Sequence, residues 1–399
     1  MSENSHTRDD LRILQALPLD MKITRTKQRL KEWVDYYGVD GVYVSFSGGK
    51  DSTVLLDIAR SMYPQIEAVF VNTGLEYPEI QSFVKTFDNV TILYPKKTFM
   101  QVLTDCGYPL LGKEIASAIR GAKRYLDAVE RERETHRLPS PYAIADMLGI
   151  DRRENPNNPI YLELKKGIIP RETTRYQIVM GKFKQKNGSK SKWDYSKYLP
   201  FLYTSFNVSE QCCDIMKKSP VHKYQKQAGK VGITAQMACE SRMRLQNWLH
   251  NGCNSFDNKF PVSNPMSFWT EQDILKYIYI NKLPIASVYG DIVIKHEDDI
   301  GDISQIHFED CESLENAVFT TTGCERTGCV FCGFGCHLEK GETRFQRLKR
   351  THPKQYDFCM NGGEYDENGV WKPNKDGLGM AHVFDEINKI YGEDFIRYK

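Results

Sequence analysis

Apolar and polar residues alternate along the first hundred positions in the pattern of an α/β protein. Short apolar runs predict strands at residues 41–46, 66–72 and 90–94. Between them, apolar positions at helical spacing predict helices at residues 51–62 and 78–88. Strands that alternate with helices form parallel sheets through right-handed crossovers, and ligands bind at the carboxyl ends of such strands. We therefore expect an α/β fold with a doubly wound, mainly parallel sheet.

The rest of the chain predicts three parts. Residues 1–40 are expected to form an N-terminal helical extension, residues 41–310 the sheet domain, and residues 311–399 a Cys-rich C-terminal segment. Residues 139–200 are rich in Pro, Asn and Lys and predict an irregular basic insertion within the sheet domain. Further elements are expected as a strand at residues 231–237 and helices at residues 112–137, 209–218, 240–250, 271–279, 344–350 and 380–391.

Composition limits the protein class. The 399 residues are 40% hydrophobic and 27% charged, with a formal net charge of +2, so charge alone indicates neither a nucleic acid nor a membrane partner. The sequence has no apolar run of about 18 residues, which predicts that no segment spans a membrane. Its 11 cysteines, without a secretory signal, favour metal ligation or redox work over disulfides and predict a cytoplasmic protein.

A Ser- and Gly-rich turn follows the first predicted strand. Ser47, Gly48, Gly49, Lys50 and Asp51 lead from that strand into the next helix. A helix N-terminus presents N–H groups and a positive dipole end to an anion, and adjacent glycines let the backbone approach a phosphate closely. The spacing is not that of a Walker A loop. It resembles the PP-loop of ATP pyrophosphatases, which split ATP between the α and β phosphates.

A second turn falls at the end of the neighbouring strand, where a nucleotide bound to the first turn would extend. We therefore interpret residues 41–310 as a nucleotide-binding domain for an adenine nucleotide, either ATP or an adenylylsulfate. The expected nucleotide-binding residues are Ser45, Ser47, Gly48, Gly49, Lys50, Asp51, Ser52, Asn72, Thr73 and Gly74.

A cysteine cluster points to a metal centre. Cys324, Cys329, Cys332 and Cys336 follow the spacing C-x4-C-x2-C-x3-C, and the adjacent pair 212–213 lies far upstream. Thiolates at such spacing can bind one iron–sulfur cluster, and ferredoxins use a similar core spacing. Zinc also accepts four thiolates, and a redox dithiol is a third interpretation. We favour iron–sulfur because no second, well-separated C-x2-C pair completes a zinc ribbon.

Basic and aromatic residues alternate within the predicted insertion. Residues 182–198 hold six lysines, among which Phe183, Trp193, Tyr195 and Tyr198 are interspersed. Such a segment suits a partner that carries phosphates and stacking bases. A solvated loop explains the same composition, so a nucleic-acid acceptor is one of two interpretations of this segment.

Together these motifs resemble the phosphoadenylylsulfate (PAPS) reductase family of PP-loop proteins, over about residues 40–360. The anchors are residues 47–52, 69–78, 212–213, 232–242 and 265–273, with Cys329 and Cys332. The resemblance implies an adenine nucleotide alpha-hydrolase-like fold. Adenylylsulfate reductases of this family hold a [4Fe–4S] cluster with a Cys-Cys pair and a distant Cys-x-x-Cys. The metal ligands implied here are Cys213, Cys329, Cys332 and Cys336, with Cys212 and Cys324 in reserve.

The sequence departs from the reductases at its C-terminus, where they carry a nucleophilic cysteine on a mobile tail. The last ten residues here contain no cysteine, and the nearest equivalent is Cys336, followed by His337, inside the cysteine cluster. We therefore favour an adenylating, sulfur-transferring enzyme that uses Mg²⁺ and a [4Fe–4S] cluster. Lys50, Asp51 and Cys336 are its expected catalytic residues.

Two alternatives stay open. One is a true PAPS or adenylylsulfate reductase that releases sulfite. The other is a nucleotide-binding regulator with a structural metal. The favoured interpretation implies a sulfur or electron donor protein as a partner, and the sequence leaves a homo-oligomer open.

Overall fold

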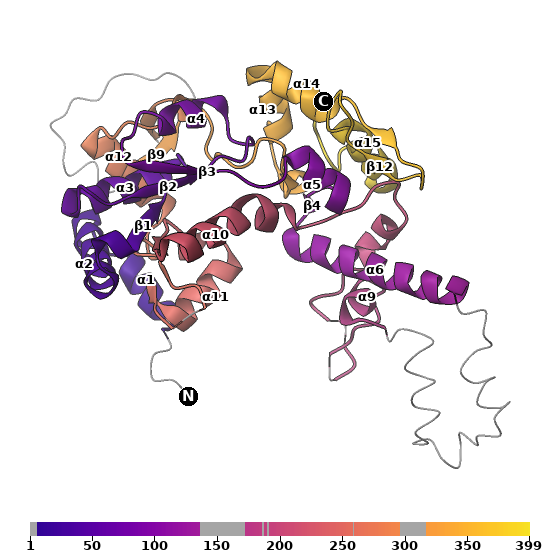
Figure 1. Cartoon of the computed structure of the whole chain (residues 1–399), viewed down its shortest axis with the longest axis horizontal. Helices are drawn as coiled ribbons and strands as arrows, with labels where there is room; N and C mark the ends of the chain where they lie inside the picture. The colour runs from indigo at the N-terminus through magenta and orange to yellow at the C-terminus, as the bar shows by residue number, and fades with distance from the viewer. Residues whose placement is uncertain (1–5, 136–171, 186, 190, 258, 296–316) are drawn as a thin grey trace, which may run out of the picture. The chain divides into compact units, whose positions relative to one another are not determined.

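The computed structural model describes residues 6–135, 172–185, 187–189, 191–257, 259–295 and 317–399 (Figure 1). The chain forms two compact units. Unit 1 comprises Met1–Thr98 and Asp214–Val330, and unit 2 comprises Phe99–Cys213 and Phe331–Lys399. These units do not follow the expected boundaries at residues 40 and 310. Phe99–Cys213, expected inside the sheet domain, belongs to unit 2, while the pairing of β1 (Val42–Ser45) with β5 (Val231–Ile233) joins the two ranges of unit 1.

Unit 1 is built on a six-stranded sheet with the strand order β3-β2-β1-β5-β7-β6. All neighbouring strands are parallel except the pair formed by β6 and β7. Val44, in the middle of β1, lies opposite Ala68 on one side and Ile233 on the other. The mainly parallel α/β sheet confirms the predicted fold class. The strands are β1 Val42–Ser45, β2 Ala68–Val71, β3 Val90–Leu93, β5 Val231–Ile233, β6 Asn254–Ser255 and β7 Val262–Ser263.

Helices flank this sheet, and α3 follows β1 directly (Figure 1). Buried residues such as Leu55 and Ile58 pack α3 into the core. α12 begins at Glu271, the predicted start, after a capping box in which Thr270 and Asp273 bond to each other's backbone. The helices of unit 1 are α1 Arg8–Gln15, α2 Leu19–Tyr37, α3 Lys50–Met62, α4 Pro78–Val84, α10 Ser219–Ala228, α11 Arg242–Asn251 and α12 Glu271–Asn281.

Of the expected residues 209–218, Cys212 and Cys213 are α-helical and Asp214–Lys218 form a π-helical segment that continues into α10 at Ser219, so the prediction is right for all but the first three residues. Pro220 lies in the first turn of α10, where a backbone N–H has no acceptor within the helix, so the proline is compatible with the helix. A two-stranded ribbon of β8 (Ile292–Lys295) and β9 (Val318–Thr321) was not predicted.

Unit 2 is mainly helical around a small parallel pair, in which Gly333 of β10 lies opposite Leu110 of β4. A Cβ at Gly333 would lie 2.7 Å from the carbonyl oxygen of Pro109, so the close pairing requires glycine. Phe345, Phe384 and Met380 are fully buried in its core. The elements are α5 Phe99–Cys106, β4 Leu110–Leu111, α6 Lys113–Thr135, α9 Thr174–Val179, β10 Gly333–Phe334, α13 Arg344–Thr351, α14 Pro353–Met360, β11 Glu364–Tyr365, β12 Trp371–Lys372 and α15 Met380–Tyr391.

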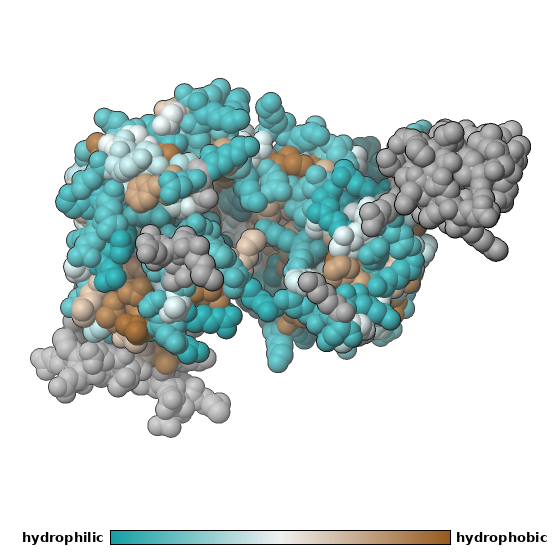
Figure 2. Space-filling view, turned by 90° about the horizontal axis from the view of Figure 1, so that it is seen from below, coloured by the Kyte–Doolittle hydropathy of each residue, from teal (hydrophilic) through white to brown (hydrophobic). Residues whose placement is uncertain are grey.

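The predicted insertion at residues 139–200 is only partly covered. Residues 139–171 lie outside the described residues, and the described remainder contributes α9 to unit 2. Figure 2 shows a mainly hydrophilic face on which hydrophobic residues form separate areas. None of the described helices is both long enough and apolar enough to cross a membrane.

Candidate functional site

The Ser- and Gly-rich turn connects the end of β1 at Ser45 to the start of α3 at Lys50. Gly48 has φ +70°, a conformation that side chains disfavour. A Cβ at Gly48 would lie 2.7 Å from Val84 Cγ2 and 2.8 Å from Ile80 Cγ2. The turn therefore requires glycine at this position on two independent grounds.

Two serines organise the interior of the turn. The Ser47 and Ser52 hydroxyls lie 3.0 Å apart, and the Ser47 amide donates to Ser52 Oγ at 3.1 Å. The Gly49 amide donates to Ser47 Oγ at 3.3 Å, and Ser52 Oγ donates to the Gly49 carbonyl at 2.9 Å. The predicted residues Ser47, Gly48, Gly49 and Ser52 thus form one hydrogen-bonded loop at the carboxyl end of β1.

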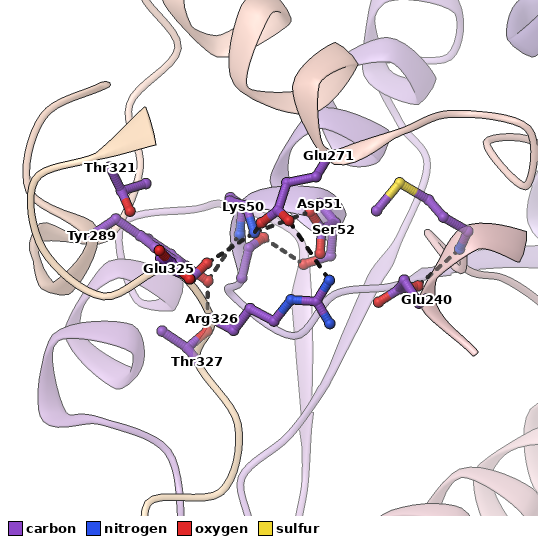
Figure 3. A network of polar contacts seen from close by, with 12 residues as sticks. Lys50, Asp51, Ser52, Glu240, Glu271, Tyr289, Thr321, Glu325, Arg326 and Thr327 are labelled. Carbon is purple, nitrogen blue, oxygen red and sulfur yellow. Dashed lines mark hydrogen bonds and ion pairs between the residues drawn. The ribbon is translucent and has the colours of Figure 1, made fainter. Parts of the chain in front are cut away.

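Lys50 is buried, with only 4% of its side chain exposed, and its ammonium group is surrounded by oxygen atoms (Figure 3). Nζ lies 3.1 Å from Glu271 Oε1, donates to the Glu325 carbonyl at 3.1 Å and lies 3.7 Å from Asp51 Oδ1. Burial alone would lower the pKa of Lys50, but the Asp51 and Glu271 carboxylates outweigh it and raise that pKa. Lys50 is therefore a charged, already paired cation.

The carboxyl group of Asp51 lies next to Lys50 but has fewer hydrogen-bond partners. Burial raises the pKa of its carboxyl group, against the lowering effect of Lys50. Its Oδ1 is shielded from solvent and accepts no hydrogen bond from any described residue. The side chain as a whole keeps 30% exposure, so its other side faces outward. A carboxylate placed this way could take part in holding a divalent cation beside a phosphate.

A segment of residues 324–330, which we call the strap, lies against the turn. The Tyr289 hydroxyl accepts the Lys50 amide at 3.2 Å and bonds Thr327 Oγ1 at 2.5 Å. The strap is also held at its end, where the Val330 amide donates to the Leu75 carbonyl at 2.8 Å. None of these partners was predicted from the sequence, because no local motif marks them.

A cavity of about 150 Å³ opens next to the turn within unit 1. Two residues of the predicted nucleotide site, Ser45 and Ser47, are among its lining residues. The sequence analysis missed the other lining residues. The cavity is lined by Ser45, Phe46, Ser47, Val69, Phe70, Val71, Glu76, Tyr77, Ile80, Lys217, Val221, Thr327 and Gly328.

The polar groups of the second predicted turn, residues 72–74, bond mainly to one another and to Glu76. Thr73 donates from its amide to Glu76 Oε2 at 3.1 Å and from Oγ1 to Glu76 Oε1 at 2.6 Å. The Gly74 amide donates to Asn72 Oδ1 at 3.1 Å. Asn72, Thr73 and Gly74 are not among the described residues that line the cavity, although Glu76 is. Their role as nucleotide contacts stays a prediction.

The predicted metal ligands divide between the units. Cys213, Cys332 and Cys336 belong to unit 2 and Cys329 belongs to unit 1, as does the reserve residue Cys324. Among the residues that the structure describes, no group of three or more His, Cys, Asp or Glu side chains is arranged to hold a metal ion. The donor set of thiols suits iron–sulfur or zinc, and the choice between them stays a prediction.

Within unit 2, Cys336 is deeply buried, and burial raises the pKa of its thiol to about 12. The guanidinium of Arg344 donates to the Cys332 carbonyl at 3.0 Å and also pairs with Glu339 at 2.6 Å. The reserve residue Cys212 is buried and Cys213 is half-buried. Nucleophilic attack and metal ligation both require the thiolate, which burial disfavours, so both roles of Cys336 stay predictions.

The basic and aromatic segment belongs to unit 2. Lys192 lies 4.2 Å from the ring centre of Trp193, and Lys197 lies 4.7 Å from that of Tyr198. Trp193 is 41% exposed, whereas Tyr198 is buried. Lys182 pairs with Glu172 at 2.6 Å. Trp193 is therefore available at the surface, whereas Tyr198 packs in the interior and Lys182 is paired with a carboxylate.

Comparisons with known proteins assign the family. The family model of the phosphoadenosine phosphosulfate reductase domain matches residues 41–97 and 168–333, more than half of the chain. An uncharacterized protein of Methanocaldococcus jannaschii, MJ0973, is 33% identical over 72 residues. That match covers 17% of this chain and only 18% of that relative.

A solved structure is also similar. The phosphoadenylyl-sulfate reductase of Candida auris, in a phosphate complex, aligns with 71% of this chain and 91% of its own, at 12% identity and a TM-score of 0.32. The assignment rests on the family model, whose two matched ranges include the turn after β1 and the strap. The chain belongs to the phosphoadenosine phosphosulfate reductase family.

Proposed function

We propose that this protein is an adenine-nucleotide-dependent sulfur-transfer enzyme that carries a [4Fe–4S] cluster. Family membership supports an enzyme whose function is related to sulfur nucleotides. The observation that carries the proposal is the hydrogen-bonded turn after β1, beside a cavity of about 150 Å³ at the carboxyl edge of a parallel sheet. Ligands of doubly wound sheets bind at this edge.

In the proposed reaction an acceptor oxygen attacks the α-phosphorus of ATP, the bond to the bridging α–β oxygen breaks, and pyrophosphate leaves. A sulfur atom from a donor protein then displaces AMP from the adenylated acceptor. The Ser47 and Ser52 hydroxyls and the N-terminus of α3 would bind the leaving phosphates. Lys50 would offset their charge, and Asp51 would hold Mg²⁺ together with the phosphates.

The cluster is proposed from the cysteine spacing, with Cys213, Cys329, Cys332 and Cys336 as ligands. Cys212 and Cys324 are the reserve ligands. When bound, such a cluster would hold or relay the sulfur that is transferred. The proposed catalytic role of Cys336 is to help hold this cluster.

The first experiment is anaerobic purification with iron and acid-labile sulfide counted. We expect about four of each per chain. Cys332→Ser should lose iron, whereas Cys239→Ser, at an exposed cysteine outside the proposed set, should retain it. One zinc and no sulfide would contradict the cluster, and the assay of pyrophosphate release would then decide whether adenylation survives without it.

The proposed acceptor is a nucleic acid that contacts residues 182–198. The exposed Trp193, with Lys192 over its ring, supports stacking next to a phosphate backbone. Pyrophosphate release should depend on adding tRNA or DNA, and Trp193→Ala should weaken that dependence. Equal release with and without nucleic acid would contradict this acceptor. A sulfur or electron donor protein completes the proposed partners, and the oligomeric state is left to measurement.

A second candidate is sulfonucleotide reduction, which the family assignment favours directly. It predicts sulfite release from adenylylsulfate or PAPS with a thiol reductant, without ATP. Sulfite release at rates above pyrophosphate release would replace the first proposal. Nucleotide binding without either product would leave a regulator with a structural metal.

A further inference from the structure

Two cations next to the turn after β1 differ in their surroundings. Lys50 is almost fully buried and paired with Glu271, Asp51 and a backbone carbonyl. Arg326, in the strap, keeps 62% of its side chain exposed. Its one described ion pair is with Glu271 Oε2, at a long 3.7 Å. Arg326 is therefore the cation that can still accept a strong anionic partner.

The strap holds Arg326 at this site from both sides. On one side, the carbonyl of Glu325 accepts a hydrogen bond from Lys50 Nζ. On the other, Thr327 bonds the Tyr289 hydroxyl, and Thr327 and Gly328 line the cavity next to Ser47. Figure 3 shows the Arg326 side chain reaching from the strap toward the side of the turn where Ser52 lies.

Charge favours an anion at this position. Glu271 is shared between Lys50 and Arg326, and the charge of Arg326 also acts on Asp51 and on the half-buried Arg244. A phosphate or sulfate group at the turn would share the charge of Lys50 with the Glu271 and Asp51 carboxylates, so a second cation is needed there. The guanidinium offers a planar pair of donors that matches such an oxyanion, and a long, exposed ion pair is easily exchanged for it.

We propose that Arg326 binds the terminal phosphate or sulfate group of the bound nucleotide and thereby ties the strap to the nucleotide. The proposal rests on the nucleotide site assigned under the proposed function. Cys324 and Cys329 lie in the same strap, two residues before and three residues after Arg326. A nucleotide held by Arg326 therefore restrains the strap that carries both cysteines.

The test compares binding of ATP, AMP and inorganic pyrophosphate by calorimetry. Arg326→Ala should weaken ATP and pyrophosphate binding at least about tenfold, the effect of one charge-assisted contact. AMP binding should change less, because AMP lacks the terminal phosphates. Arg326→Lys should recover part of the affinity at low salt. The matched control is Arg12→Ala, which removes another exposed arginine of unit 1 that pairs with a carboxylate, Asp9.

A second readout follows the strap. ATP should slow amide hydrogen exchange in peptides that cover residues 324–330 in the wild type but not in Arg326→Ala, as followed by mass spectrometry on folded protein. Equal ATP and pyrophosphate affinities in Arg326→Ala and Arg12→Ala would overturn the inference and leave the proposed function intact. Wild-type protein that binds neither probe would overturn both, and binding without turnover would overturn the proposed function alone.

Discussion

The Tyr289 hydroxyl links the turn to the strap by hydrogen bonds, and its removal tests whether this link holds the site together. Tyr289 is 2% exposed, accepts the Lys50 amide and bonds Thr327 Oγ1. Tyr289→Phe deletes only the hydroxyl and keeps the ring that packs in the core. The Lys50 amide, in a residue 3% exposed, is then left without its acceptor.

An unsatisfied buried donor destabilises a protein by about 1–3 kcal/mol. At about 1.4 kcal/mol per factor of ten, local opening of the turn should become about 5- to 150-fold more frequent. The loss should be confined to unit 1, because both hydrogen-bond partners belong to it. Nucleotide affinity should fall as well, because the turn and the strap would no longer be held together by this hydroxyl.

The assay is native-state hydrogen exchange followed by mass spectrometry on peptides that cover residues 47–55. Exchange there should accelerate by the stated factor, while peptides of α15 in unit 2 should be unchanged. The control is Tyr36→Phe, at a residue of unit 1 that is 69% exposed. If Tyr289→Phe exchanges like Tyr36→Phe, the hydroxyl does not hold the turn and the reasoning fails.

Three further outcomes follow from single side chains. Gly48→Ala should destabilise the protein by about 1–3 kcal/mol more than Gly74→Ala in urea unfolding. Both glycines have positive φ, but only Gly48 would bring a Cβ into contact under 3 Å, so equal losses would contradict the packing argument. Burial would raise the pKa of Glu67, but hydrogen bonds, first that of Lys230, outweigh it and lower that pKa. Its stabilisation is therefore complete above the ordinary value of 4.5 and lost as pH falls through the lowered pKa, so Glu67→Gln should flatten the acid dependence of stability between about pH 5 and 3. Cys359, fully buried with a raised pKa, should resist iodoacetamide in folded protein, and its modification before unfolding would show that the core of unit 2 opens.

The site shows how far local patterns extend. Ser47 and Gly48 could be identified because a turn between a strand and a helix is formed by consecutive residues. In the structure both residues lie in that turn. Glu271 and Tyr289 were missed, although they contact Lys50 directly. They lie more than 200 positions away in the sequence, and although Glu271 falls within the anchor at residues 265–273, no local pattern pairs either residue with Lys50.

The same division applies to the fold. The sequence by itself determined the parallel α/β class, because apolar periodicity sets strands and helices locally and their alternation leaves few topologies. The predicted starts of α12 and α15, at residues 271 and 380, also agree with the structure. Three features depend instead on tertiary contacts: β5 lies beside β1, Glu271 pairs with Lys50, and Arg326 stays exposed. These are contacts between distant segments, and their energies depend on burial and neighbouring charge, which no single stretch of sequence contains.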